Sequence, residues 1–347
     1  MSVVAHKKIR QISKSAVLDA VEQVMKLASW KSFVKGNVFV KVNLLSHQVV
    51  PGLCTSPWVL EGVLRVLQKK TKSITVGDAD VATTRQVDKG AKNWGYLDVC
   101  KDVGARFVNL SKYPVRKKTG NDILKTVEFP TPLTDADSIV TIPVPKTHNV
   151  STMTGALKNQ WGTIPRYRHL YHDHVHEVIA EINKALKVDF AVADATVCIE
   201  GEGPRTGTPK AMNSVLASHD LVSLDATLAT MMGFKLCEIP FIAHAEKLGI
   251  GSSKFDIIGD ELEIIPFVRA NISNHPVVNI EMMFIKIPFF KHLLFHTPLF
   301  KIFAAGATFY NTIVWHELKG KKLAKDFLKK NQEYAKEFSS IHFVEYL

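Results

Sequence analysis

The sequence predicts a protein of the α/β class with a mainly parallel sheet, on three observations. Apolar runs of strand length alternate with segments of helical periodicity through the first two thirds of the chain. The spacing of these runs is typical of strands joined by helices, which is how parallel sheets are connected. The chain has 347 residues, of which 46% are hydrophobic and 22% charged, and this is enough to bury a core. These values exclude a disordered, collagen-like or disulfide-stapled chain.

The predicted elements follow in order along the first 270 residues. The first thirty residues combine charges with an amphipathic pattern and lack the apolar stretch of a signal peptide, so we expect a cytoplasmic protein. Ser56 followed by Pro57 predicts a helix that begins there and runs to about residue 67. The other elements are strands expected at 37–42, 73–77, 106–110, 138–144, 189–195 and 255–258, and a helix at 221–232. This order predicts a doubly wound, Rossmann-like sheet in a domain of residues 1–270.

Residues 271–347 are predicted to form an apolar and basic, mostly helical C-terminal region. The stretch 277–315 is dense in Phe, Ile, Leu and Met, and Pro288 and Pro298 divide it into short helical pieces. Because prolines and lysines interrupt this stretch, a membrane-spanning helix is not expected. A helix buried in a second core and an interfacial helix on a membrane are both alternatives, and the basic residues 319–330 fit the second.

The charge of the chain points to anionic partners. The net charge is +11 and the pI is near 9.3. The sequence has no RNP, KH or zinc-finger signature, so nucleic acid is not expected as a partner. The alternatives are a small phosphate or carboxylate ligand and an anionic membrane surface, to which the protein would attach peripherally. The four cysteines stand far apart, which excludes a ferredoxin-type cluster motif.

Ionisable and amide side chains gather where the predicted strands end. Open α/β sheets bind ligands at the carboxyl ends of their strands, so we expect these side chains to form one shared site. The residues at or just after these ends are Lys41, Asn43, Ser56, Asp78, Lys146, His148, Asp194 and Glu200.

The segment 145–165 carries a predicted anion site. Thr152 or Thr154 could cap the helix that follows, and the first-turn amides of this helix would then face the crevice and bind an anion. Lys158 and Asn159 lie about one turn further along. Lysines, a histidine and free amides suit phosphate or carboxylate binding. They also suit acid/base catalysis if burial lowers the pKa of a lysine.

Histidines are dense between residues 168 and 177. If this segment is helical, His169, His172 and His176 share one face; if it is extended, His172, His174 and His176 do. Either arrangement could bind a divalent transition metal, and His172 and His176 are the predicted ligands. A proton-transfer role for His172 and a structural or surface cluster are the alternatives.

The glycine-rich loop 200–207 is a further candidate. Gly201 and Gly203 would let the backbone approach a ligand closely, and Arg205 could clamp a carboxylate or phosphate with two hydrogen bonds. The loop is neither a Walker loop nor a dinucleotide fingerprint. Asp225 is expected to cap the helix that it heads rather than to take part in catalysis.

Four segments carry a family resemblance. They are KVNLL (41–45) with TSP (55–57), VGDAD (76–80), PKTHNVSTMTGALKNQWGTIP (145–165) with Tyr171-His172, and DATVCIEGEGPRTG (194–207). Over about residues 41–251 the chain resembles the uncharacterised domain-of-unknown-function 362 family, and His172 stands where the family motif has its histidine. Some members carry ferredoxin-like iron–sulfur domains. The resemblance therefore implies a redox setting, and a separate ferredoxin-type electron carrier as partner because this chain lacks the cluster cysteines.

Together these observations predict an enzyme that binds a small anionic substrate or cofactor at the strand ends. Acid/base or metal-assisted proton or hydride transfer is the expected chemistry, and the oxidoreductase and the isomerase or racemase classes both fit. The alternative is a non-catalytic metal-, nucleotide- or lipid-binding protein that docks to a membrane through its C-terminal region; a homo-oligomer is also open. The predicted catalytic residues are Lys146, His148, Lys158, His172, Asp194 and Glu200. The predicted binding residues are Lys41, Asn43, Ser56, Asp78, Asn159, Gly201, Gly203 and Arg205.

Overall fold

The computed structural model describes residues 2–81, 86–164, 168–271, 276–339 and 341. Within these residues the centre is a ten-stranded sheet whose main path runs β12-β1-β11-β10-β7-β2-β3-β4. Neighbours on this path are parallel except where β11 lies between β10 and β1. The predicted α/β class with a mainly parallel sheet is confirmed.

Five parallel strands form the half of the sheet that carries the site. They are β2 (Asn37–Val42), β3 (Ser73–Asp78), β4 (Arg106–Asn109), β7 (Ser138–Ile142) and β10 (Phe190–Glu200), and all five were predicted. Across the sheet they stand in the order β4-β3-β2-β7-β10, so the chain moves outward from β2 to β4 and then returns to the other side of β2 at β7. This is the strand order of a Rossmann-like sheet, and the reversal between β2 and β7 is its topological switch point.

The other half of the sheet was mostly not predicted. It contains β1 (Ser2–Lys8), β11 (Thr208–Ser218) and β12 (Phe255–Gly259), of which the sequence analysis found only β12. β11 carries proline, lysine and asparagine among its apolar residues, so its sequence does not show the regular alternation of apolar and polar residues that is typical of a strand. A separate hairpin of β5 (Val115–Thr119) and β6 (Thr126–Pro130) was also missed.

Helices cover both faces of the sheet, as a doubly wound fold requires. Alternate residues of one strand enter different cores, because Val38 and Val40 pack on one face and Phe39 on the other. The first face is covered by α1 (Lys14–Leu27), α2 (Pro57–Gln68), α3 (Val87–Asn93) and α4 (Tyr96–Asp102). The second face is covered by α6 (Ala156–Asn159), α7 (Val175–Leu186), α8 (Leu221–Met231) and α9 (Pro240–Lys247).

Two predicted helix starts have different outcomes. Ser56 caps α2 as predicted, since its hydroxyl oxygen accepts a hydrogen bond from the amide of Val59 at 3.2 Å. In α8 the cap is Asp220, whose carboxylate accepts from the second and third amides of the helix. Asp225 lies inside α8, so the expectation that it caps its own helix is wrong.

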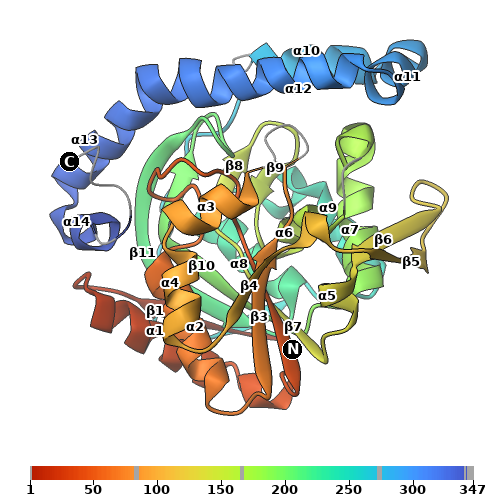
Figure 1. Ribbon diagram of the computed structural model, residues 1–347. Helices are drawn as coiled ribbons and strands as arrows, with labels where there is room; N and C mark the ends of the chain where they lie inside the picture. The colour runs from red at the N-terminus through yellow and green to blue at the C-terminus, as the bar shows by residue number, and fades with distance from the viewer. Residues whose placement is uncertain (1, 82–85, 165–167, 272–275, 340, 342–347) are drawn as a thin grey trace.

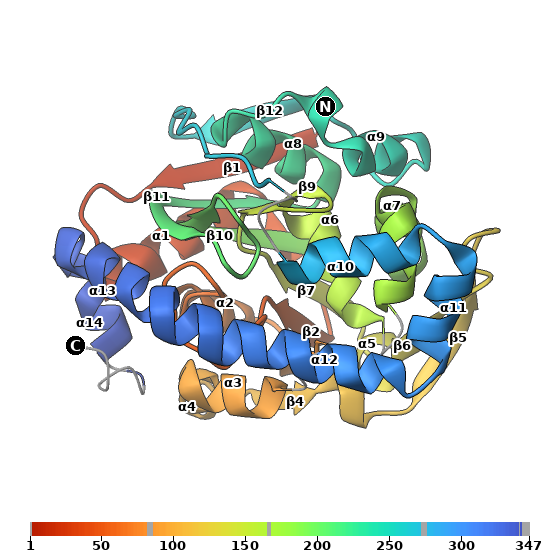
Figure 2. The same ribbon diagram turned by 90° about the horizontal axis from the view of Figure 1, so that it is seen from above.

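The C-terminal region is helical, as predicted. Its elements are α10 (Pro276–Ile285), α11 (Pro288–His296), α12 (Leu299–Phe309), the π-helical stretch η7 (Tyr310–Gly320), α13 (Lys321–Lys330) and α14 (Gln332–Ser339). The two predicted proline breaks are confirmed, because α11 begins at Pro288 and α12 directly follows Pro298. In Figure 1 the helices α10 to α12 lie across one end of the core, near β8 and β9, and α13 and α14 descend along its side; Figure 2 shows the same arrangement from above.

The two ends of this region pack differently. Leu328, Tyr334 and Phe338 of α13 and α14 belong to the same apolar core as α1 and α2, whereas Ile285, Leu294 and Phe295 form a small cluster of their own. The boundary at residue 270 stays a prediction. Among the helices in the described residues, none has the length and apolar character that crossing a membrane requires.

Candidate functional site

A cavity of about 180 Å³ opens at the switch point between β2 and β7. Its wall combines the loops after β2 and β3 with the small hairpin of β8 (Lys146–His148) and β9 (Thr152–Thr154), and with α6. The predicted site residues that meet in this wall are Lys41, Asn43, Asp78, Lys146, His148, Lys158, Asn159 and His172. A cavity at this place agrees with the rule that open α/β sheets bind ligands at their switch points.

Lys41 and Asp78 form a buried ion pair in the wall of this cavity. The Nζ of Lys41 lies 2.8 Å from Oδ1 of Asp78 and also donates to the carbonyl oxygen of Val42. The two carboxylate oxygens of Asp78 accept hydrogen bonds from the amides of Leu44 and Ala79 as well. Burial lowers the pKa of Lys41, and the charge of Asp78 opposes this shift. The pair therefore neutralises itself and holds the loop after β2 in place.

Lys146 is bound by neutral oxygens rather than by a carboxylate. Its Nζ donates to Oδ1 of Asn43 and to the carbonyl oxygen of Leu53, at 2.6 Å each. The side-chain amide of Asn43 in turn donates to Oδ1 of Asn159 at 3.1 Å. Burial lowers the pKa of Lys146 to about 8. The hydrogen bonds to its neutral partners therefore do not fully compensate for the desolvation of the ammonium group.

Lys158 and Arg168 are the two cations of the cavity with the fewest partners. Lys158 is 7% exposed, and its Nζ lies 5.0 Å from the centroid of the Trp161 ring. Arg168 is 6% exposed; its Nη2 donates to the carbonyl oxygen of Asp80, and its Nη1 is buried with no partner in the described structure. Among the described residues no carboxylate forms an ion pair with either side chain. Burial lowers the pKa of Lys158 to about 7.

The tautomer of His148 is set by the backbone of the β8–β9 turn. Its Nδ1 lies 3.0 Å from the amide nitrogen of Val150 and 3.3 Å from that of Ser151. Both amides donate, so Nδ1 accepts and the ring proton resides on Nε2. Burial lowers the pKa of His148 well below its usual value, and the charge of Lys158 adds to this. His148 is therefore a neutral N–H donor in the cavity wall.

The predicted anion site at the N-terminus of α6 is corrected by the structure. Thr152 and Thr154 lie in β9 and do not cap the helix. The first amides of α6, those of Ala156 and Leu157, donate to the two oxygens of Asp225 at 2.5 and 3.0 Å. Asp225 thus caps a neighbouring helix instead of its own, and the amides that were expected to face a ligand are occupied.

The predicted site residues Ser56, Asp194 and Glu200 lie outside the cavity. Asp194 accepts hydrogen bonds from the amide of Ser56 at 2.7 Å and from the amide and hydroxyl of Thr196. Glu200 forms an ion pair with Lys210 at 2.7 Å. The structure therefore does not bring Ser56, Asp194 and Glu200 to the other site residues.

The glycine-rich loop is near the cavity but does not supply the predicted cradle to it. At Gly203 a Cβ atom would lie 2.1 Å from the carbonyl oxygen of Thr147, so glycine is needed there for backbone packing. Gly201 adopts a positive φ of 74°. Arg205 donates to the carbonyl oxygen of Leu45 and lines a neighbouring cavity of about 130 Å³.

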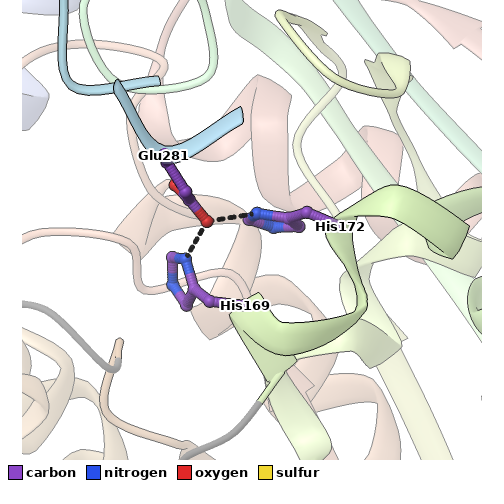
Figure 3. A group of neighbouring side chains, drawn as sticks. All are labelled: His169, His172 and Glu281. Carbon is purple, nitrogen blue, oxygen red and sulfur yellow. Dashed lines mark hydrogen bonds and ion pairs between the residues drawn. The ribbon is translucent and has the colours of Figure 1, made fainter. Parts of the chain in front are cut away.

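The histidine-rich segment is helical. His169 and His172 lie on a 3₁₀ helix (Arg168–His174), where residues three apart in sequence lie above one another. Their Nδ1 atoms lie 3.0 and 2.7 Å from the same carboxylate oxygen of Glu281, which comes from α10 (Figure 3). Burial by itself would raise the pKa of Glu281, but the two histidines hold it well below its usual value.

His176, one of the two predicted metal ligands, lies elsewhere. It is part of α7, and its ring stacks on Phe241 with 6.2 Å between the ring centroids. The group of potential metal ligands that the described residues bring together is His169, His172 and Glu281. Of the two predicted ligands, only His172 belongs to it.

The fold and the site define an α/β protein with a cation-lined cavity at the switch point of a Rossmann-like sheet. The chain belongs to the family described as "Domain of unknown function (DUF362)", which it matches over residues 38–230, and the predicted resemblance is confirmed. A thylakoid-associated protein of Synechocystis sp. (strain ATCC 27184 / PCC 6803 / Kazusa), sll1697, is 27% identical over 243 residues, which are 67% of this chain and 74% of that protein.

One similar solved structure is the lactate racemase apoprotein from Thermoanaerobacterium thermosaccharolyticum. Its TM-score is 0.39 and its sequence identity 14%, over 65% of this chain and 56% of that chain. The chain thus spans little more than half the length of that protein.

Sequence analysis missed three residues of this site. Arg168 stands within the histidine-rich segment, but no strand end or motif marks it as a ligand group. Trp161, which stacks on His172 and lies under the ammonium of Lys158, reads in the sequence as an ordinary core residue. Glu281 is separated from His172 by 109 residues and lies in the apolar C-terminal region. A lone acidic residue in an otherwise apolar helix was the signal that could have found it.

Proposed function

We propose that the protein is an enzyme that binds a small carboxylate or phosphate at the switch-point cavity and transfers a proton to or from the bound ligand. The observation that carries this proposal is the pair Lys158 and Arg168. Both are more than nine-tenths buried in the cavity wall, and neither has a carboxylate partner among the described residues. The buried Nη1 of Arg168 has no hydrogen-bond acceptor there.

Electrostatics favours an anion as the ligand. A buried cation without a partner is strongly unfavourable, and a bound anion would remove this penalty through charge-assisted hydrogen bonds. Asp78, the carboxylate among the described residues of the cavity wall, is already engaged by Lys41 and by two backbone amides. The cavity therefore keeps an excess of positive charge that a carboxylate or phosphate would neutralise.

The expected chemistry follows from the protonation states of the wall residues. Lys158 has a pKa lowered to about 7, which suits a general base or acid at neutral pH. Arg168 would hold the carboxylate or phosphate group, and the Nε2–H of His148 would donate to a neighbouring oxygen. Proton transfer beside a carbonyl or carboxylate is the reaction that this set supports best, which fits the isomerase or racemase class.

The binding step is tested by isothermal titration calorimetry with inorganic phosphate and with oxalate. We expect Arg168→Gln to weaken binding by about 10- to 100-fold, because a hydrogen bond to a charged group contributes roughly 1.5–3 kcal/mol. The matched control is Arg65→Gln, since Arg65 is an exposed arginine that pairs with Glu61. Equal affinities of the wild type and Arg168→Gln, or no binding of either anion, would contradict the proposal.

The catalytic step is tested by hydrogen–deuterium exchange. A panel of 2-oxo and 2-hydroxy carboxylates is incubated with protein in D₂O, and loss of the C–H signal next to the carbonyl or carboxylate is followed by NMR. We expect exchange with at least one member of the panel, and none with Lys158→Met. Tight anion binding without exchange of any C–H bond would instead favour a non-catalytic binding protein.

A second candidate function, attachment to an anionic membrane surface, is favoured by the C-terminal region. Phe289, Ile302 and Leu318 are 70%, 69% and 72% exposed, and they belong to a larger group of exposed apolar side chains between residues 280 and 318. Exposed lysines, among them Lys286 and Lys301, accompany this apolar group. Apolar side chains flanked by lysines are typical of helices that lie in a membrane interface.

Vesicle flotation tests this second candidate. We expect the protein to float with vesicles of mixed phosphatidylglycerol and phosphatidylcholine, and less with pure phosphatidylcholine. The triple variant Phe289→Ser, Ile302→Ser and Leu318→Ser should not float. The control is Leu97→Ser, which removes an exposed apolar side chain from the core region. If the protein binds neither kind of vesicle but sediments as a dimer, a second copy of the chain covers this surface instead.

A further inference from the structure

His169, His172 and Glu281 form an isolated group at the edge of the switch-point cavity. The ligand atoms of these three side chains all lie within 4.8 Å of one another. Glu281 is buried and forms an ion pair with each of the two histidines. Figure 3 shows both imidazoles turned towards the same carboxylate, one from each side. The group thus joins the histidine-rich segment of the core to the C-terminal region.

The geometry of the group is held by its surroundings. The ring of His172 stacks on Trp161 with 5.5 Å between centroids and 10° between planes, which fixes the direction of its Nδ1. The rings of His169 and His172 meet edge to face at 4.7 Å. Both histidines also line the switch-point cavity, so the group is in contact with the space between Lys158 and Arg168. One 3₁₀ helix therefore presents two fixed nitrogen ligands to one carboxylate of α10.

We propose that His169, His172 and Glu281 bind one divalent ion of the first transition series. Bonds of about 2.0–2.2 Å place neighbouring ligand atoms about 3.3–3.6 Å apart in a tetrahedral site and about 2.8–3.1 Å apart in an octahedral one, and the Nδ1–Oε1 distances are 3.0 and 2.7 Å. Two imidazoles and one carboxylate suit Zn²⁺, Fe²⁺, Co²⁺ or Ni²⁺ better than Mg²⁺ or Ca²⁺, which prefer oxygen ligands only. The metal would take the place of the protons that now lie between the imidazoles and the carboxylate.

Three protein ligands leave at least one coordination position open, as in catalytic rather than structural metal sites. Both histidines line the switch-point cavity, which Lys158 and Arg168 also line, and all three ligands line the neighbouring cavity of about 130 Å³. An anionic ligand held by these cations could coordinate the metal through one oxygen. Only the role of the metal in the reaction rests on the proposed function, since metal binding can be measured without substrate.

The experiment is a metal titration of the full chain, purified without chelators and then stripped. Zn²⁺ binding is measured by competition with a chromophoric chelator, and Co²⁺ binding by visible absorption. We expect one metal site per chain. His172→Gln and Glu281→Gln should each lower the metal affinity at least tenfold, because even the loss of a residue that only hydrogen-bonds to a metal ligand costs about 10- to 100-fold in affinity. Glu281→Gln keeps the size of the side chain and can still accept from both histidines, so it tests the metal without removing the contact.

Two matched variants complete the design. His174→Gln changes an exposed histidine of the same 3₁₀ helix, and His176→Gln changes the histidine on α7; neither should alter the affinity. The proposal is overturned if the wild-type chain takes up neither ion, or if Glu281→Gln binds both as tightly as the wild type. If the metal-free protein then still binds oxalate in an Arg168-dependent way, the proposed function stands without the metal site. If metal binds as expected but oxalate does not, the metal site stands and the proposed function is contradicted.

Discussion

The hydrogen-bonding groups of two buried polar clusters in this protein are satisfied in opposite ways. In the first, Asp194 accepts hydrogen bonds from the backbone and side chain of Thr196 and from the amide of Ser56. In the second, Lys158 and Arg168 line the cavity without a carboxylate partner among the described residues. The comparison teaches that burial alone does not mark a functional residue. The proposed site rests instead on unsatisfied hydrogen-bonding capacity at a cavity, because a buried donor without a partner costs free energy that a bound ligand would offset.

The first cluster also connects the C-terminal region to the core. The hydroxyl of Ser56 donates to a carboxylate oxygen of Glu337 in α14. Burial raises the pKa of Glu337 to about 8, and the charge of Asp194 adds to this. The polar side chains of this cluster thus hydrogen-bond to one another and to the backbone, and these bonds connect α14 to the core.

The largest expected effect on stability comes from a substitution in the first cluster. Asp194→Ala should lower the free energy of unfolding by about 3 kcal/mol or more, because it leaves three buried donors without an acceptor at roughly 1–3 kcal/mol each. Urea unfolding followed by circular dichroism measures this. Oxalate affinity of the folded fraction should not change. A loss of stability below about 1 kcal/mol would mean that the cluster is not structural.

The second prediction concerns the stability of the cavity region. The pKa of Lys158 is lowered to about 7 in the folded chain and is near 10.5 when unfolded. Between these values the unfolded chain binds more protons, so stability rises with pH, by up to about 1.4 kcal/mol per pH unit for one proton. Lys158→Met should be more stable than the wild type at pH 7, and the difference should shrink towards pH 10. Equal pH slopes of the two proteins in urea unfolding would refute this.

The pH dependence of anion binding should depend on Lys158. Oxalate keeps its charge between pH 6 and about 9, so any change in its affinity reports on the protein. Because Lys158 loses its proton as the pH rises through about 7, wild-type affinity should fall above this pH, by at most about tenfold per pH unit. Calorimetry at several pH values measures the profile. In Lys158→Met the part of the profile due to this lysine should be missing, while Lys146, with a pKa of about 8, continues to contribute.

The smallest expected effect is that of Gly162→Ala. A Cβ atom at Gly162 would lie 3.0 Å from Oδ1 of Asp78 and 3.1 Å from Nζ of Lys41. The flexible lysine end can move by a few tenths of an ångström, so we expect a change of a few-fold in oxalate affinity and less than about 1 kcal/mol in stability. An unchanged affinity would show that the Lys41–Asp78 pair does not influence the ligand. A large loss of stability would show that the pair cannot move.

Sequence patterns predicted the parallel half of the sheet well and the other half poorly. β2, β3, β4, β7 and β10 are short apolar runs, and such runs are recognisable without any tertiary context. β11 mixes polar and apolar residues, and its place between β10 and β1 is fixed by pairing with distant strands. Such pairing cannot be seen in a local window.

The same division holds for the site. Lys41, Asn43, Asp78 and Lys146 were found because the strand ends of a parallel sheet share one edge, and β2 and β7 flank the switch point. Asp194 follows the same rule but turns to the backbone of Ser56, a choice that depends on side-chain direction and not on sequence position. Asp225 and Glu281 act on elements far away in the chain, and no spacing motif connects them to their partners.

The position of Glu281 on α10 has a consequence for the order in which the protein is made. A ribosome synthesises His169 and His172 before Glu281, by 112 and 109 residues respectively. The part of the chain that matches the family ends at residue 230, also before Glu281 is made. A nascent chain of this length contains the five parallel strands and the cavity cations, but its two histidines lack their carboxylate. The group of His169, His172 and Glu281 is therefore completed late in synthesis, and any ligand that needs Glu281 must bind after α10 has docked.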